Sequence, residues 1–206
     1  MDSYQTSQVF ETCEVSQTLK KMKYEPLTSD SFYHIYNCGN NREDIFIEER
    51  NYNYFLLLIK KYVLSVAQVW SYCLLKNHFH LIIKTKEKIN DKDISQAFSN
   101  LFNAYSKAIN KAYQRSGSLF KDRFSRIKIE EENYLKKVII YINANAVHHG
   151  FVVKSEDYKF CSYLALITDK RTLIERDDII ELFENRENFK YVIKQKQDII
   201  EELALE

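Results

Sequence analysis

Residues 68–85 read QVWSYCLLKNHFHLIIKT, and this stretch decides the fold. Two runs rich in aliphatic, β-branched and aromatic residues, Gln68–Leu75 and His78–Thr85, predict two strands. Only Lys76 and Asn77 separate them, which is the spacing of a β-hairpin. We therefore expect the two strands to lie side by side and antiparallel.

Further strands and helices are expected on either side of this hairpin. A strand over Phe32–Asn37 ends at the turn-rich residues 38–41, and a basic strand spans Phe124–Ile129. Apolar residues spaced by three and four predict helices over Glu48–Leu64, Ile94–Gln114 and Glu131–Val147, with two or three short helices after Tyr158. Helices that alternate with antiparallel strands predict an α+β fold, with the helices packed on one face of the sheet.

Length and composition indicate one core with an appendage. The chain has 206 residues but only three glycines and one proline, which argues against a long flexible linker. Residues 1–30 have few apolar positions and no clear period, so we expect them to be loosely ordered. No run approaches the roughly 20 apolar residues of a membrane span, and Met1–Asp30 has no apolar signal segment. The four cysteines (Cys13, Cys38, Cys73 and Cys161) are far apart, as in a reduced cytoplasmic protein.

Charge is distributed unevenly along the chain. The formal net charge is only +1, but residues 105–129 carry seven basic residues and one acidic residue, a net +6. From 169 to 206 there are 11 acidic and seven basic residues, a net −4. A basic middle is typical of nucleic-acid binding and equally of a solvated helix face, so charge alone favours neither interpretation.

His78-Phe79-His80 is the first candidate for chemistry. Side chains two apart leave a strand on the same face, about 7 Å apart, so the two imidazoles could share a metal ion. Phe79, Leu81 and Ile83 would take the opposite face and be buried against helices. The alternative is a pair of polar residues on a wet sheet face, and the motif alone does not exclude it.

The helix expected over Glu131–Val147 carries the second candidate. Tyr141 and Asn145 lie beside its apolar stripe and are four residues apart, so they stack on one flank about 6 Å along the axis. Tyr134 and Lys137 share that flank. The alternative is that Tyr141 is one of 15 tyrosines, half-buried beside the core.

Five segments in order then resemble one family, the IS200-like and REP-associated tyrosine transposases. An opening strand and turn, FYHIYNCGNNR (32–42), precedes a histidine–hydrophobic–histidine strand, YCLLKNHFHL (72–81). A basic segment, GSLFKDRF (117–124), precedes the tyrosine helix YINANA (141–146) and a closing motif, DYKFCSY (157–163). The resemblance covers residues 32–163.

The resemblance implies a fold and a set of roles. It implies a ferredoxin-like HUH fold, with a transposase domain at 31–164 and an acidic helical extension at 165–206. His78, His80 and Asn145 would hold Mg²⁺ or Mn²⁺, and Tyr141 would be the nucleophile. The activity implied is metal-dependent cleavage and strand transfer of single-stranded DNA through a 5′-phosphotyrosine. Two departures stand out: Leu75-Lys76 replaces the usual Met-Pro, and Ala146-Val147-His148 follows Asn145 in place of a proline and a basic residue.

Basic and aromatic residues predict how DNA would bind. The candidate contacts with phosphate are Lys107, Lys111, Arg115, Lys121, Arg123, Arg126 and Lys137. Four aromatic rings (Tyr105, Tyr113, Phe120 and Phe124) could stack on unpaired bases, although about half of them are expected in the core. We expect single-stranded or hairpin DNA to be preferred over plain duplex.

Other interpretations remain open at this point. A retired transposase could bind DNA without cutting it, and a replication initiator or relaxase shares the histidine strand and the tyrosine. A structural zinc module could use His78, His80 and a cysteine, although we expect Cys73 to lie on the far side of the turn. The acidic tail could pack on the core, support a homodimer or restrain the site.

Overall fold

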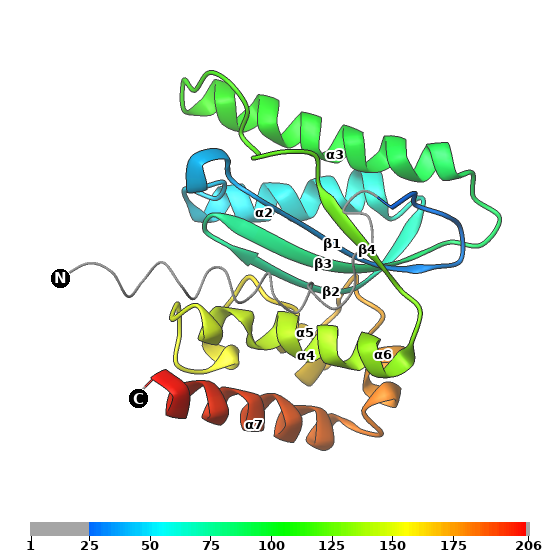
Figure 1. The fold of residues 1–206 in the computed structure, drawn as a ribbon, viewed down its shortest axis with the longest axis vertical. Helices are drawn as coiled ribbons and strands as arrows, with labels where there is room; N and C mark the ends of the chain where they lie inside the picture. Colours follow the sequence, from blue (N-terminus) through cyan, green and yellow to red (C-terminus); the bar gives the residue numbers. More distant parts are fainter. Residues whose placement is uncertain (1–24, 205–206) are drawn as a thin grey trace.

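A four-stranded antiparallel sheet forms the centre of the molecule (Figure 1). The structure is a computed structural model that describes residues 25–204, with side chains described as far as residue 196. The strand order is β2-β3-β1-β4. The strands are β1 (Phe32–Cys38), β2 (Ala67–Leu75), β3 (His78–Thr85) and β4 (Ser125–Ile129). The predicted hairpin is present, because β2 pairs antiparallel with β3 and Leu75 lies opposite His78.

Helices cover both faces of this sheet. One layer holds α2 (Glu49–Leu58), its π-helical continuation η2 (Ile59–Val63) and α3 (Asp91–Ala112). The other layer holds α4 (Glu132–His148), α5 (Tyr163–Ile167), α6 (Arg176–Leu182) and α7 (Arg186–Ala204), as Figure 1 shows. Two short 3₁₀ turns, η1 (Asn40–Arg42) and η3 (Ser155–Asp157), complete the elements.

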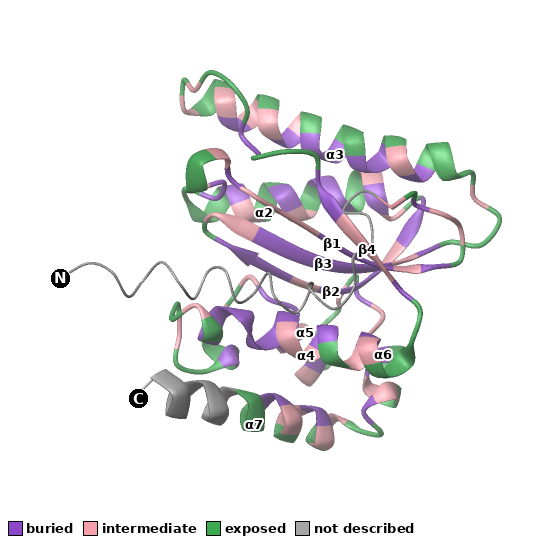
Figure 2. Cartoon of the chain, viewed as in Figure 1, coloured by how far each residue is buried: buried purple, intermediate pink, exposed green. Residues whose placement is uncertain are grey.

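The expected α+β class is confirmed, with one correction: the helices do not pack on a single sheet face. Phe79, Leu81 and Ile83 are buried on the face toward α2 and α3, as predicted. The opposite face also buries apolar side chains such as Ile82, so it needs cover as well. Figure 2 shows the resulting buried strands between the two helical layers. The apolar stripe of α4 supplies that cover.

Two helices differ from their expected bounds for local reasons. The side chain of Asn90 accepts a hydrogen bond from the Lys92 amide at 2.9 Å and caps α3, so this helix begins before Ile94. It ends at Ala112 because Gln114 has a φ of 50°, in the left-handed region. At the other end of the chain, α7 has 19 residues instead of being short, because Phe189 and Ile193 bury against the core.

Residues 1–30 were expected to be loosely ordered, and the structure describes only Glu25–Asp30 of this segment. Residues 1–24 lie outside the described residues. Leu27 is buried in the core, and the Tyr33 hydroxyl donates to the carbonyl of Pro26 at 3.0 Å. The stretch just before β1 is therefore packed against the sheet. Across residues 25–204, every helix is too short or too polar to cross a lipid bilayer.

A buried polar network fixes α4 on the sheet. The Asn143 amide nitrogen donates to Ser71 Oγ on β2 at 3.0 Å, and its amide oxygen accepts from Ser162 Oγ at 2.8 Å. Ser71 and Ser162 also hydrogen-bond each other at 2.9 Å. The Ser155 hydroxyl donates to the Asn143 carbonyl at 2.7 Å. Because these groups are buried, each needs its partner, and α4 is held in one register over the strands.

We predict that Asn143→Ala lowers the free energy of unfolding by about 2 kcal/mol or more, since it removes the buried hydrogen bonds that Asn143 forms with Ser71 and Ser162. Urea unfolding measures this directly. Asn103→Ala, at an exposed position on α3, is the matched control and should have little effect. Equal stability of the two variants would contradict the anchoring role of Asn143.

Candidate active site

Three histidines gather on the sheet face that α4 covers. His78 and His80 lie on the same face of β3, with ring centroids 5.4 Å apart. His34 of β1 stacks on His80 at 5.1 Å, and Tyr36, directly opposite His80 in the register, stacks on it at 5.9 Å. His80 is buried and His78 is half-buried under α4, so the wet-face alternative for this histidine pair does not hold.

One ring nitrogen of each β3 histidine already has a hydrogen-bond partner. Nδ1 of His78 donates to the side-chain oxygen of Asn77 at 2.8 Å. Nδ1 of His80 lies 3.0 Å from Nε2 of His34. In both rings it is therefore Nε2 that remains to offer a lone pair, as in histidine ligands whose other nitrogen is held in place.

Burial keeps this cluster uncharged at neutral pH. Loss of hydration lowers the pKa of His34 to about 4 and that of His78 to about 4. The pKa of His80 falls well below its ordinary value, through burial first and then through its histidine neighbours. Neutral imidazole is the form that binds a metal ion, so no proton has to leave these rings before they can act as ligands.

Helix α4 brings Tyr141 and Asn145 to the same place. The Tyr141 ring lies 5.3 Å from the His80 ring, nearly perpendicular to it. Burial raises the pKa of the Tyr141 phenol, and the neighbouring Asn145 acts in the opposite direction. Asn145 also raises the pKa of His78, against the larger effect of burial. The structure thus brings together all four residues expected to hold a metal or act as nucleophile.

The Asn145 side chain is the most informative member of the group. It is fully buried and interacts with the His78 ring and the Tyr141 phenol closely enough to shift their pKa values, yet neither its Oδ1 nor its Nδ2 forms a hydrogen bond of normal geometry with any described residue. An amide buried in this way costs about 1–3 kcal/mol. Such a cost indicates a missing partner, and the place of Asn145 beside two neutral imidazoles fits a divalent cation.

His149, at the C-terminal end of α4, is a neighbour that the sequence prediction missed. Its ring centroid lies 4.8 Å from that of His78. Ala146 allows α4 to continue to His148 where the family usually has a proline, and this brings His149 to the sheet. The spacing of four from Tyr141 to Asn145 to His149 is the signal that could have revealed it.

The side chains near His78 and His80 also test the alternative of a structural zinc module. Within the described residues, no group of three or more His, Cys, Asp or Glu side chains is arranged to hold a metal ion. A site here therefore depends on the Asn145 amide as its third donor. Cys73 was expected on the far side of the turn, but this is wrong: its register partner is His80, and it is buried beside Cys161. Cys73 shares the histidine face because the two strands pair directly.

Two of the predicted DNA contacts lie beside the end of β1. Lys121 and Arg123 are exposed in the loop before β4. The Lys121 amide donates to the Cys38 carbonyl at 2.9 Å, and the Asn37 side chain donates to the carbonyl of Asp122 at 3.0 Å. Since Cys38 is paired with His78, this loop is held at the edge of the histidine cluster.

The remaining predicted contacts are more dispersed. Lys107 and Lys111 are exposed on α3, in the layer across the sheet from α4, whereas Lys137 is exposed on α4 one turn before Tyr141. Arg115 lies beyond the end of α3 and pairs with Glu43. Arg126 donates to the Glu25 carbonyl and lies 4.9 Å from the Phe124 ring.

Most of the aromatic rings proposed for base stacking are part of the core. Tyr105, Phe120 and Phe124 are buried, and Phe102 packs against Phe120 at 5.5 Å. Tyr113 is half-buried, and its hydroxyl donates to Glu48. More of these rings are therefore part of the core than the half we expected, because the apolar stripe of α3 packs against the sheet.

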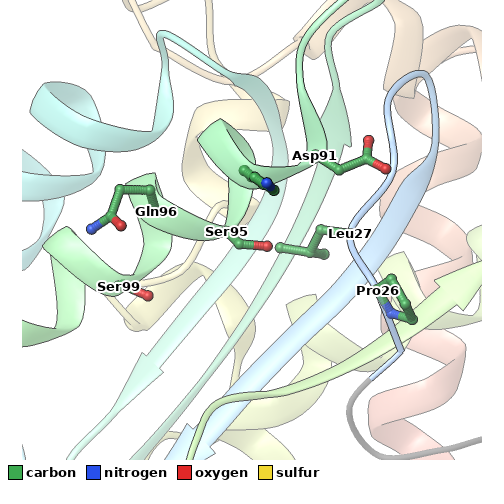
Figure 3. Close-up of a pocket in the computed structure, with 7 residues that line it drawn as sticks. Pro26, Leu27, Asp91, Ser95, Gln96 and Ser99 are labelled. Carbon is green, nitrogen blue, oxygen red and sulfur yellow. The ribbon is translucent and has the colours of Figure 1, made fainter.

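One surface pocket lies away from the histidine cluster. It has a volume of about 420 Å³ and lies between the start of α3 and residues 26–27, as the close-up in Figure 3 shows. Pro26, Leu27, Asp91, Ser95 and Ser99 line it, and none of these is a residue of the cluster. It opens on the α3 side of the sheet. The buried Asn145 amide and the neutral imidazoles lie at the histidine cluster, away from this pocket.

An antiparallel sheet that presents two histidines to a tyrosine-bearing helix is the arrangement of the tyrosine transposases that the sequence resembles. The family model described as "Transposase IS200 like" matches residues 28–145. The match spans more than half of the chain, so the chain belongs to the IS200-like transposase family.

One solved structure supports this fold, and a second match is weaker. A REP-associated tyrosine transposase bound to a REP hairpin is similar with a TM-score of 0.60 at 18% identity, covering 72% of this chain and 86% of that one. A candidate transposase from Deinococcus radiodurans R1 gives a TM-score of 0.39 at 12% identity, covering 57% of this chain and 93% of that one. No curated protein matches the chain.

We predict that Asn145→Leu stabilises the protein in a chelator by about 1 kcal/mol or more, because it removes an unsatisfied buried amide while keeping the side-chain shape. The same variant should lose the stabilisation that Mn²⁺ gives the wild type. Urea unfolding with EDTA and with Mn²⁺ measures both effects.

Asn143→Leu is the matched control, since Asn143 is equally buried two residues away but fully hydrogen-bonded. It should be destabilising in both conditions. If Asn145→Leu destabilised the protein in the chelator as much as Asn143→Leu does, the interpretation of Asn145 as a metal ligand would be wrong.

Proposed function

We propose that the protein is a DNA transposase that cuts and rejoins single-stranded DNA through a covalent bond to Tyr141. The observation that carries this proposal is the convergence of Tyr141 and the unsatisfied Asn145 amide on the His78 and His80 pair. The two elements come from distant parts of the sequence, and only the packing of α4 on the sheet joins them.

Tyr141 is the group that would attack the scissile phosphate. Its phenolic oxygen forms a bond to phosphorus as the bond from phosphorus to the 3′-oxygen breaks. The products are a 5′-phosphotyrosine and a 3′-hydroxyl, so the proton that the phenol loses balances the one that the departing oxygen gains. A second 3′-hydroxyl can reverse the step and complete strand transfer without a nucleotide cofactor.

His78, His80 and Asn145 would hold a divalent cation at this place. When bound, Mg²⁺ or Mn²⁺ supplies Lewis-acid chemistry that stabilises negative charge on the phosphate and on the departing oxygen. Two imidazoles and one amide favour Mn²⁺ over Mg²⁺, which prefers an all-oxygen shell. Tyr141 keeps its proton until it reacts, because burial raises the pKa of its phenol above the ordinary value near 10.

Single-stranded or hairpin DNA is the proposed substrate. A similar protein, the REP-associated tyrosine transposase, was solved bound to a REP hairpin. In this chain the exposed Lys121, Arg123 and Lys137 stand nearest to the cluster among the predicted contacts, and they would hold the backbone on either side of the cut. Lys107 and Lys111, across the sheet, would contact a more distant part of the DNA.

The second candidate function is DNA binding without cleavage. The sequence favours it at one point: Ala146, Val147 and His148 replace the proline and basic residue that the family usually carries. The site residues themselves are all retained. Formation of a covalent adduct distinguishes the two functions.

We predict that Tyr141→Phe abolishes the covalent protein–DNA adduct while DNA affinity stays close to that of the wild type. The assay incubates the protein with labelled single-stranded hairpins and Mn²⁺ and detects a complex that survives denaturation. Tyr134→Phe, two turns earlier on α4, is the control and should form the adduct. An adduct that survives in Tyr141→Phe but is lost in Tyr36→Phe would mean that Tyr36, and not Tyr141, is the nucleophile.

We predict that the double variant Lys121→Ala/Arg123→Ala weakens hairpin binding and makes its salt dependence shallower, by about one unit of slope for each lost phosphate contact. Titrations at several salt concentrations measure both effects. Lys60→Ala/Lys61→Ala removes two exposed charges from η2, in the other layer, and should change neither. An equal loss in both double variants, or equal wild-type affinity for an unstructured duplex, would contradict the proposed path of the DNA.

A further inference from the structure

His34 makes a direct side-chain contact with a proposed metal ligand. It lies on β1, on the face that α4 covers, and its Nε2 stands 3.0 Å from Nδ1 of His80. Both side chains are buried. Within the described residues, this is the side-chain hydrogen bond that the structure gives His34, so its buried imidazole is directed at His80.

A hydrogen bond between two neutral imidazoles allows two proton arrangements. If His80 donates from Nδ1, its Nε2 carries a lone pair and can bind a cation. If His34 donates instead, His80 must carry its proton on Nε2, and that nitrogen cannot be a ligand. Only the first arrangement is compatible with His80 as a ligand, and it requires His34 to accept.

The surrounding rings limit how His80 can turn. The Tyr36 ring stacks on His80 at 5.9 Å and lies 5.0 Å from His34. The Tyr141 ring also contacts His80, nearly perpendicular to it, with centroids 5.3 Å apart. These contacts confine the His80 ring but cannot choose its tautomer, because they do not discriminate between its two nitrogens. The hydrogen bond between His80 and His34 is the contact that involves one particular nitrogen of His80, Nδ1, and therefore bears on its tautomer.

We infer that His34 is a positioning residue that accepts the Nδ1 proton of His80 and thereby holds Nε2 of His80 ready to bind the divalent cation. This inference rests on the proposed function, in which His80 is a metal ligand. His34 itself touches neither the cation nor the DNA in this scheme. Its effect is on the affinity of the site and on the electronic environment of the bound ion.

A merely structural role would predict something different. An apolar ring of similar size could fill the same space beside Tyr36 and His80 without the cost of burying an imidazole. His34→Phe therefore keeps the packing and removes the acceptor. His34→Gln loses the ring but places an amide oxygen about where Nε2 stood, so it restores an acceptor for His80.

The experiment measures metal binding to the full-length chain without DNA. Calorimetry with Mn²⁺ gives affinity, and the visible absorption of bound Co²⁺ reports on the ligands of the ion. We expect His34→Phe to bind Mn²⁺ about 10–100-fold more weakly than the wild type and to alter the Co²⁺ spectrum. His34→Gln should restore most of the affinity and a spectrum close to that of the wild type.

Thr85→Val is the control for general destabilisation. Thr85 is buried at the far end of β3, where its hydroxyl donates to the Thr28 carbonyl at 2.7 Å and accepts from the Ser31 amide at 2.9 Å. Its loss should lower stability while leaving Mn²⁺ affinity unchanged.

The possible failures point to different parts of the account. A wild-type protein that binds neither Mn²⁺ nor Co²⁺ would overturn the proposed metal site itself. If the wild type binds metal and forms the DNA adduct, while His34→Phe gives the same Mn²⁺ affinity and the same Co²⁺ spectrum, the inference about His34 alone is overturned. Equal losses in His34→Phe and His34→Gln would also overturn it, because restoring the acceptor would then have no effect.

Discussion

The position of α4 on the sheet is the constraint on which the site depends. Tyr141 and Asn145 are separated by more than 60 residues of sequence from His78 and His80, and only this packing brings them together. Asn143 lies between Tyr141 and Asn145 on α4, and its side chain donates a hydrogen bond to Ser71 of β2. On its outer side α4 is covered by α7, so the acidic tail packs against the tyrosine helix in the described residues. The packing of α4 therefore holds Tyr141, the proposed nucleophile, beside the histidine pair of the same chain.

Polar side chains occupy buried positions around the histidine cluster. A sheet face that packs on a helix would be more stable with aliphatic side chains at His34 and His80, which are buried and uncharged. Asn145 adds an amide that finds no hydrogen-bond partner of normal geometry among the described residues. Natural proteins break packing rules in this way mainly at functional sites. The orphaned amide and the neutral imidazoles are consistent with a site completed by a cation.

Short-range periodicity predicted much of this structure, because its consequences are local. Alternation along β3 separated the buried Phe79 from its two histidine neighbours, and the spacing of four placed Tyr141 and Asn145 on one side of α4. The contact between His34 and His80 could not be predicted, since it depends on the register between β1 and β3. The end of α3 before Arg115 could not be predicted either. It follows from the left-handed backbone of Gln114, a residue without a strong turn preference. The presence of helices on both faces of the sheet was not predicted, because packing between layers is not a property of one segment.

The central claim is that His78, His80 and Asn145 share one cation beside Tyr141. A crystal structure of the Mn²⁺-loaded protein, with anomalous scattering at the manganese edge, tests it most directly. We predict one strong anomalous peak bounded by these three side chains, with the Asn145 oxygen directed at the ion. A fully occupied Mn²⁺ site elsewhere, with the Asn145 amide still unsatisfied, would contradict the account.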